Sequence, residues 1–236
     1  MADPSVDKSP DRIRAMFDQI SPRYDFLNHL LSLNTDVLWR RRAAALCAGA
    51  NRVLDVCSGT GDLAFEIRRQ WGSEVVGSDF SLRMVEIARS KARRRDLGDH
   101  VRFQQADTMR LPFRDSSFDA VTVAFGIRNV MDAARGISEM TRVARSGGKV
   151  VILEFSLPER PLLRRAYLLY FGSFLPRIGQ MIARSAIDGY RYLPDSVALW
   201  PRPEALKALM ERARLRDVTY KLVFGGIAAL HSGVKA

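Results

Sequence analysis

The chain has 236 residues, of which 47% are hydrophobic and 27% charged. This balance is typical of one folded domain with a sizeable core, and it excludes a largely disordered chain. Cys47 and Cys57 are too few for a disulfide framework and lack the spacing of a metal site, so we expect a reducing cytoplasm and no metal. The net charge of +11 indicates either a basic solvated surface or contact with an anionic partner.

The basic residues gather beside apolar helical stretches, at 40–42, 91–95 and 160–165. This placement favours a membrane surface over a nucleic-acid groove. Residues 1–10 are polar and do not resemble a signal peptide, and the most apolar stretch, 166–176, is too short to cross a bilayer. We therefore expect a cytoplasmic protein with peripheral contact at the inner face of the cytoplasmic membrane and no nucleic-acid partner.

Residues 1–50 predict a helical extension, because Met16, Phe17, Ile20 and Tyr24 recur at helical spacing. From residue 52 the pattern changes to short apolar runs that alternate with helical stretches. This alternation predicts βαβ units and a doubly wound parallel sheet. The expected strands are 52–57, 74–79, 101–105, 117–124 and 149–155, and the expected helices are 62–70, 81–95, 131–143 and 202–213.

A mostly helical insertion is expected at about 157–200. The last two β-like runs, 216–223 and 226–231, predict a closing antiparallel hairpin. We therefore expect a single domain overall: an α/β unit at 51–236 behind a helical extension or lid at 1–50, with Tyr24, Asp25 and Asn28 as residues of the lid.

A glycine-rich turn follows the first expected strand. Asp55 precedes it, and Gly59 and Gly61 allow a ligand to approach the backbone closely. Asp79 closes the second strand, where a carboxylate can accept both hydroxyls of a ribose, while Ser81 is the better helix cap. These residues alone leave a dinucleotide enzyme and a methyltransferase both open.

Two later features discriminate between a dinucleotide enzyme and a methyltransferase. Asp107 follows the third strand, where an acidic group can reach the amine of adenine, and an apolar strand begins at Phe118-Asp119 and ends at Phe125-Gly126. Together with the glycine turn, this series resembles the class I S-adenosylmethionine-dependent methyltransferases. The resemblance implies a Rossmann-like α/β fold with a mostly parallel seven-stranded sheet and a C-terminal antiparallel hairpin.

The resemblance also implies S-adenosyl-L-methionine as cofactor. It assigns Asp55 and the turn to the methionine part, Asp79 to the ribose and Asp107 to adenine. The resemblance implies further cofactor-binding residues in the turn, directly after Asp79 and Asp107, and at the end of the fourth strand. They are Gly59, Thr60, Gly61, Phe80, Thr108, Ala124 and Phe125.

Four flanking segments narrow the resemblance to the ubiquinone/menaquinone biosynthesis C-methyltransferase family, which the chain resembles from Met16 to Val234. Departures from the family pattern are Asp36 in place of histidine, Leu27 in place of methionine, and Ala144-Arg-Ser146 in place of a lysine–proline run. The similar segments are Tyr24-Asp-Phe-Leu-Asn28 with Trp39, Phe125-Gly-Ile-Arg-Asn129, Arg142 to Ser156, and Tyr190-Arg-Tyr-Leu-Pro-Asp-Ser196.

This resemblance implies methylation of a ring carbon of a polyprenyl hydroquinone, with demethylmenaquinol as the expected substrate. The benzoquinol of ubiquinone biosynthesis and another small hydrophobic phenol stay open, and a non-catalytic scaffold is disfavoured by the intact turn and acids. A homodimer is a further expectation. The insertion is expected to hold the prenyl tail or to contact lipid through Leu162, Leu163, Tyr167, Leu169, Tyr170, Phe174 and Leu175, with Arg164, Arg165 and Arg177 on headgroups.

Ring methylation requires a phenolate aligned with the methyl donor. Arg128 is predicted to stabilise that phenolate, with a structural arginine tied to a carboxylate as the alternative. Asn129 is expected to orient the same loop, and His29 is a candidate base that could instead be packed. Tyr190 and Tyr192 would line the ring pocket or pack against the core.

Overall fold

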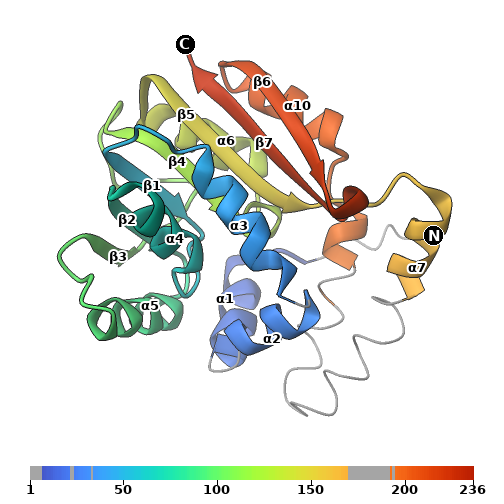
Figure 1. Ribbon diagram of the computed structural model, residues 1–236, viewed down its shortest axis with the longest axis horizontal. Helices are drawn as coiled ribbons and strands as arrows, with labels where there is room; N and C mark the ends of the chain where they lie inside the picture. Colours follow the sequence, from blue (N-terminus) through green and yellow to red (C-terminus); the bar gives the residue numbers. More distant parts are fainter. Residues whose placement is uncertain (1–6, 22–23, 33, 170–191, 193–194) are drawn as a thin grey trace.

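A computed structural model describes residues 7–21, 24–32, 34–169, 192 and 195–236. At its centre lies a seven-stranded sheet in the order β3-β2-β1-β4-β5-β7-β6 (Figure 1). The first five strands pair in parallel, and β7 runs antiparallel to both of its neighbours. This is the expected Rossmann-like α/β fold. The strands are β1 (Arg52–Val56), β2 (Glu74–Asp79), β3 (Val101–Gln105), β4 (Phe118–Ala124), β5 (Ala144–Phe155), β6 (Leu215–Val223) and β7 (Ala228–Lys235).

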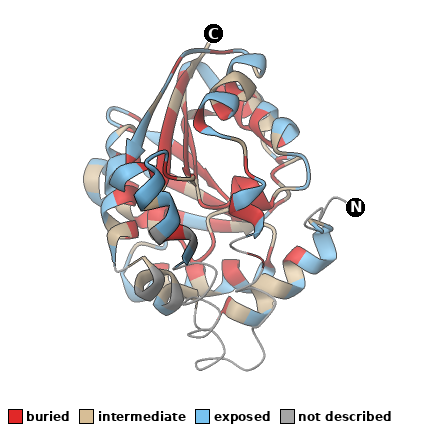
Figure 2. Ribbon diagram, turned by 90° about the vertical axis from the view of Figure 1, so that its right-hand side faces the viewer, coloured by how far each residue is buried: buried red, intermediate tan, exposed pale blue. Residues whose placement is uncertain are grey.

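Helices cover both faces of the sheet, and Figure 2 shows buried strands between helices whose outer sides are exposed. Val53 faces a core shared with α3, α4 and α5, while its neighbour Leu54 faces a second core shared with α6 and α10. Because successive side chains of a strand alternate between faces, central parallel strands are apolar throughout. The helices are α1 (Pro10–Ile20), α2 (Tyr24–Leu31), α3 (Thr35–Ala45), α4 (Asp62–Trp71), α5 (Leu82–Arg94), α6 (Ala133–Val143), α7 (Pro161–Leu169) and α10 (Pro203–Arg212).

The closing hairpin is longer than the sequence predicted. The last strand extends to Lys235 because it pairs with β5 from Lys149, opposite Val234, to Phe155, and with β6, where Lys235 lies opposite Leu215. Gly233 lies within this strand, where a Cβ atom would come within 2.9 Å of Val218. The polar and glycine residues at 232–233 therefore continue the strand instead of ending it.

The N-terminal helices lie at the carboxyl edge of the parallel strands. Asp18 of α1 accepts a hydrogen bond from the hydroxyl of Ser81, and Arg83 Nε donates to Ser21 Oγ over 3.0 Å. These contacts hold α1 against the start of α5. Much of the expected insertion, including Tyr170, Phe174, Leu175, Arg177 and Tyr190, lies outside the described residues.

Candidate active site

A cavity of about 770 Å³, including its open mouth, lies where β1 to β4 end beneath α1. The strand ends and the loops after them contribute Cys57, Gly59, Asp79, Phe80, Ser81, Asp107, Thr108, Met109, Phe125, Gly126, Asn129, Val130 and Met131, and the helices and N-terminal segment contribute Lys8, Pro10, Ile13, Arg14, Phe17, Tyr24 and Met84.

Asp79 is held by two backbone amides. Its Oδ2 accepts from the Gly59 N–H over 2.8 Å, and its Oδ1 accepts from the Ser81 N–H over 2.9 Å. Burial raises the pKa of Asp79 and these amides oppose that rise. Ser81 caps α5 by accepting from the Met84 N–H, as predicted, so the Asp79 carboxylate is free of that role and lines the cavity.

The turn after β1 is packed too closely for side chains at two glycines. A Cβ on Gly61 would lie 2.6 Å from the ring of Phe103, and Gly61 has a φ of +94°. A Cβ on Gly126 would lie 2.3 Å from the Cβ of Cys57, because the loops after β1 and β4 touch there. These glycines therefore let the turn after β1 pack against the ring of Phe103 and against the loop after β4.

The loop after β3 presents Asp107 and Thr108 to the same cavity. Asp107 Oδ1 accepts from the Met109 N–H over 2.8 Å, and Thr108 Oγ1 lies 3.3 Å from Cys57 Sγ. Burial raises the pKa of the Cys57 thiol, so this cysteine stays neutral and packs as a small side chain. The expected cofactor residues Gly59, Asp79, Phe80, Asp107, Thr108 and Phe125 all line this cavity.

Asp55 lies beneath the turn and does not line the cavity. Its side chain is buried and accepts from the Thr122 hydroxyl over 2.7 Å, and burial raises its pKa to about 7. Thr60 faces Asp25 and Lys91, and Gly61 and Ala124 also lie outside the lining. Direct contact with the methionine part, as predicted for Asp55, is therefore not supported by its position, since its hydrogen bond ties β1 to β4.

Arg128 occupies a buried ion pair. Its Nη1 lies 2.6 Å from Glu154 Oε1 and donates to the Phe125 carbonyl over 2.7 Å, and its guanidinium lies 5.1 Å from the Phe155 ring centroid. Arg128 does not line the cavity, so its geometry fits the structural alternative better than contact with a phenolate. Asn129 does line it, and accepts from the Tyr192 hydroxyl over 3.0 Å.

His29 pairs with the residue that departs from the family pattern. Its Nδ1 lies 3.1 Å from Asp36 Oδ2, and Asp36 also binds Arg40. Burial acts to raise the pKa of Asp36, but the Arg40 charge together with hydrogen bonds from Ser32, His29 and Arg40 holds that pKa below its usual value. His29 therefore belongs to a hydrogen-bonded network with Asp36 and Arg40 and does not line the cavity. This position does not favour the prediction that His29 acts as a base.

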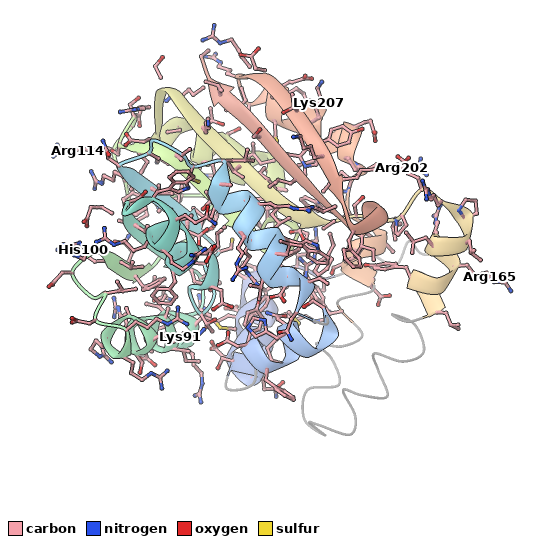
Figure 3. All side chains as sticks on the ribbon, in the orientation of Figure 1. Lys91, His100, Arg114, Arg165, Arg202 and Lys207 are labelled. Atoms are coloured by element: carbon pink, nitrogen blue, oxygen red, sulfur yellow. The ribbon has the colours of Figure 1, made fainter. Side chains whose placement is uncertain are left out.

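A second network joins α2 to the cofactor turn. Lys91 of α5 is labelled in Figure 3. Its Nζ lies 2.6 Å from the carboxylate of Asp25 in α2 and 3.0 Å from that of Asp62 in α4. The Thr60 hydroxyl donates to Asp25 and accepts from Lys91. A residue of the glycine turn is thus hydrogen-bonded directly to the helix expected to act as lid.

The sequence predicted a lid within residues 1–50, but it named no residue of α1 as part of the cavity wall. Ile13 and Phe17 line the cavity one helical turn apart, and the Arg14 guanidinium lies 4.5 Å from the centroid of Phe80. Their helical spacing was visible in the sequence, but it does not distinguish a helix that packs on a core from one that closes a ligand cavity.

Comparison with known proteins adds to this geometry. The model of the ubiE/COQ5 methyltransferase family matches residues 5–235. The chain belongs to this family. Members similar to it include the demethylmenaquinone methyltransferase of Thermus thermophilus, 48% identical over 92% of this chain and 99% of that one, and the ubiquinone/menaquinone biosynthesis C-methyltransferase UbiE of Geobacter sp. strain M21, 44% identical over 98% and 99%.

Solved structures agree with the fold of this family member. An S-adenosylmethionine-dependent methyltransferase from Thermotoga maritima superposes with a TM-score of 0.68 at 18% identity, covering 95% of this chain and all of that one. Phosphoethanolamine N-methyltransferase 2 of Haemonchus contortus, solved with S-adenosyl-L-methionine, gives 0.67 at 15% identity over 94% and 60%. The family member is thus a class I methyltransferase whose cofactor is S-adenosyl-L-methionine.

Proposed function

We propose that the chain methylates a ring carbon of demethylmenaquinol to give menaquinol. The observation that carries this is a single cavity with acids at the ends of β2 and β3 and an apolar wall from α1, in a chain 48% identical to a demethylmenaquinone methyltransferase of almost equal length. The acidic end suits an adenosine, and the apolar wall suits an aromatic ring with a prenyl tail.

The cofactor, when bound, supplies an electrophilic methyl group on a sulfonium. Asp79 would accept the ribose hydroxyls, because its two backbone donors hold both oxygens at the cavity. Asp107 would accept from the adenine amine, and Phe80 and Thr108 would pack against the base. The glycine turn would approach the methionine part with its backbone, with Asp55 holding the turn from below.

We propose that Arg128 and Asn129 position the loop after β4. Arg128 links that loop to β5 through Glu154, and the Tyr192 hydroxyl donates a hydrogen bond to the side-chain carbonyl oxygen of Asn129. The Asn129 amide group is then oriented to donate into the cavity, where a ring hydroxyl would accept. Benzoquinol methylation remains the alternative substrate assignment, and the experiment below separates the two.

Residues 1–50 would act as a lid over the domain at 51–236, since α1 forms one wall of the cavity and α2 is bound to the turn through Asp25.

A homodimer stays a prediction. It is tested by measuring the molar mass of the purified protein by light scattering.

Peripheral membrane contact is part of the proposal. The surface formed by α7 and the turn between β6 and β7 carries Leu162, Leu169 and Phe224, whose exposed fractions are 84%, 63% and 58%. The two segments touch, because a Cβ on Gly225 would lie 2.5 Å from Leu163. Arg165 projects outward from α7 beside them (Figure 3), so apolar anchors and positive charge share one surface. No helix within the described ranges is both long and apolar enough to span a bilayer.

The substrate is tested by extracting quinones from cells that lack the gene. Accumulated demethylmenaquinone that disappears when the gene is restored supports the proposal, whereas accumulation of a benzoquinone precursor assigns the alternative. Membrane contact is tested by sedimentation with vesicles of phosphatidylglycerol or phosphatidylcholine. Leu162→Asp should weaken binding to the anionic vesicles, while Lys207→Met, on the outer side of α10 (Figure 3), should not.

A further inference from the structure

Lys8 is the cationic side chain that lines the cavity near the ends of β4 and β5. It precedes α1 and shares the lining with Pro10, Asn129 and Met131. Its Nζ lies 5.9 Å from the centroid of Trp200, and Arg128 and Glu154 act on it electrostatically. Because Arg128 and Glu154 belong to the β4 and β5 ends, Lys8 lies over that part of the sheet edge.

The adenosine side of the cavity lies at the other end of the same edge. Asp79 and Asp107 follow β2 and β3, and the sheet order places β1 and β4 between those strands and β5. At ~4.8 Å between neighbouring strands, the ends of β2 and β5 are about 14 Å apart. A cofactor bound at the acids would leave the Lys8 end of the cavity for the second substrate.

Lys8 is also a cation whose charge is not neutralised locally. Among the described residues it makes no hydrogen bond or ion pair, in contrast to Arg128, which Glu154 neutralises. Burial lowers the pKa of Lys8, the neighbouring Arg128 lowers it further, and Glu154 opposes both. A partly buried, unpaired ammonium is stabilised by an anion that enters the cavity.

We propose that Lys8 contacts the ring oxygen of the quinol and stabilises its phenolate during methyl transfer. This inference rests on the proposed quinol methylation and assigns to Lys8 the role that the sequence predicted for Arg128. The quinol loses its phenolic proton to water, and the ring carbon takes the methyl group as the carbon–sulfur bond breaks with its electron pair left on sulfur. The ring carbon then loses its hydrogen as a proton while the oxygen regains one, so one proton is released per turnover.

The proposal is tested with Lys8→Met, which removes the charge but keeps a flexible apolar stem, and with Lys8→Arg, which restores a cation. Lys207→Met is the matched control on the outer side of α10, where Lys207 pairs with Glu211. The probe is 1-naphthol, bound in the presence of S-adenosylhomocysteine, and its ionisation is followed by absorbance across pH. Turnover of demethylmenaquinol and cofactor affinity are measured on the same proteins.

We expect Lys8→Met to raise the ionisation midpoint of bound naphthol by about one pH unit or more, because an opposite charge at 4–6 Å shifts a pKa by about 1 to 3. Turnover should fall at least about tenfold with cofactor affinity unchanged, and Lys8→Arg should recover part of it. An unchanged midpoint in Lys8→Met would overturn the proposal. The naphthol result is independent of substrate identity, so a wild-type enzyme inactive on demethylmenaquinol would refute the proposed function without deciding Lys8.

Discussion

Removing the carboxylate of Glu154 should destabilise the protein strongly, because it leaves the Arg128 charge buried. The side chains of Glu154 and Arg128 are only 1% and 7% exposed, and 2.6 Å separates the charged atoms. Breaking a buried pair by removing one partner costs about 3–5 kcal/mol. In a chain of this length each kcal/mol lowers the melting temperature by about 2–4 °C, so Glu154→Gln should melt ~6 to 20 °C lower.

The assay is thermal unfolding followed by circular dichroism, with calorimetric titration of the cofactor. Arg128→Met should be destabilised to a similar extent, and the double variant Arg128→Met/Glu154→Gln should melt above either single variant because no buried charge is left unpaired. Cofactor affinity should fall in the single variants, since Phe125, whose carbonyl Arg128 binds, lines the cavity. If Arg128→Met melts within 2 °C of wild type yet has no turnover, Arg128 acts on the substrate and our assignment of it as a positioning residue is wrong.

Four further predictions concern the cofactor side of the cavity and the lid. Asp79→Ala should weaken cofactor binding at least about 100-fold in calorimetry, because two charge-assisted hydrogen bonds are lost; unchanged affinity would remove the ribose assignment. Burial raises the pKa of Asp55 to about 7, so the wild-type protein loses free energy of unfolding as the pH rises from 4 to 7 and this carboxyl ionises. In urea unfolding, Asp55→Asn should therefore gain about 1.4 kcal/mol per pH unit relative to wild type over this range. A constant difference in free energy between the two proteins from pH 5 to 7.5 would contradict this. Gly126→Ala should cost about 1–3 kcal/mol, because its Cβ would lie 2.3 Å from that of Cys57, and no change in the unfolding midpoint would show that the loops separate easily. Lys91→Met should raise the KM for the cofactor and increase amide exchange in α2, and unaltered exchange would mean that its contacts with Asp25 do not hold the lid.

The fold was predictable because its signals are local. Val53 and Leu54 lie in a run that is apolar on both faces, and such runs alternating with amphipathic helices leave little choice besides a parallel sheet. Asp79 and Asp107 could be placed for the same reason, since the carboxyl ends of parallel strands meet at one edge.

The partners of charged side chains were less predictable, because they depend on distances between segments far apart in the sequence. Nothing near Arg128 indicates that Glu154, 26 residues later, takes up its charge. The partner of His29, Asp36, is only seven residues away, but it is directed toward His29 only once α2 and α3 pack. In both cases a residue type suited to catalysis proved to be paired with a carboxylate.

The two ends of the cavity differ in how they are held, and this bears on which of them can change between related enzymes. The acids follow strands of the sheet, and Asp79 is held by two backbone amides, so substitutions elsewhere hardly move it. Lys8 and the α1 wall are attached through side-chain contacts such as Arg83 with Ser21 and Asp18 with Ser81. Side-chain contacts can be replaced one at a time without disturbing the sheet. Substrate choice between naphthoquinol and benzoquinol should therefore depend on α1 and the residues before it, while the cofactor end stays the same for either ring.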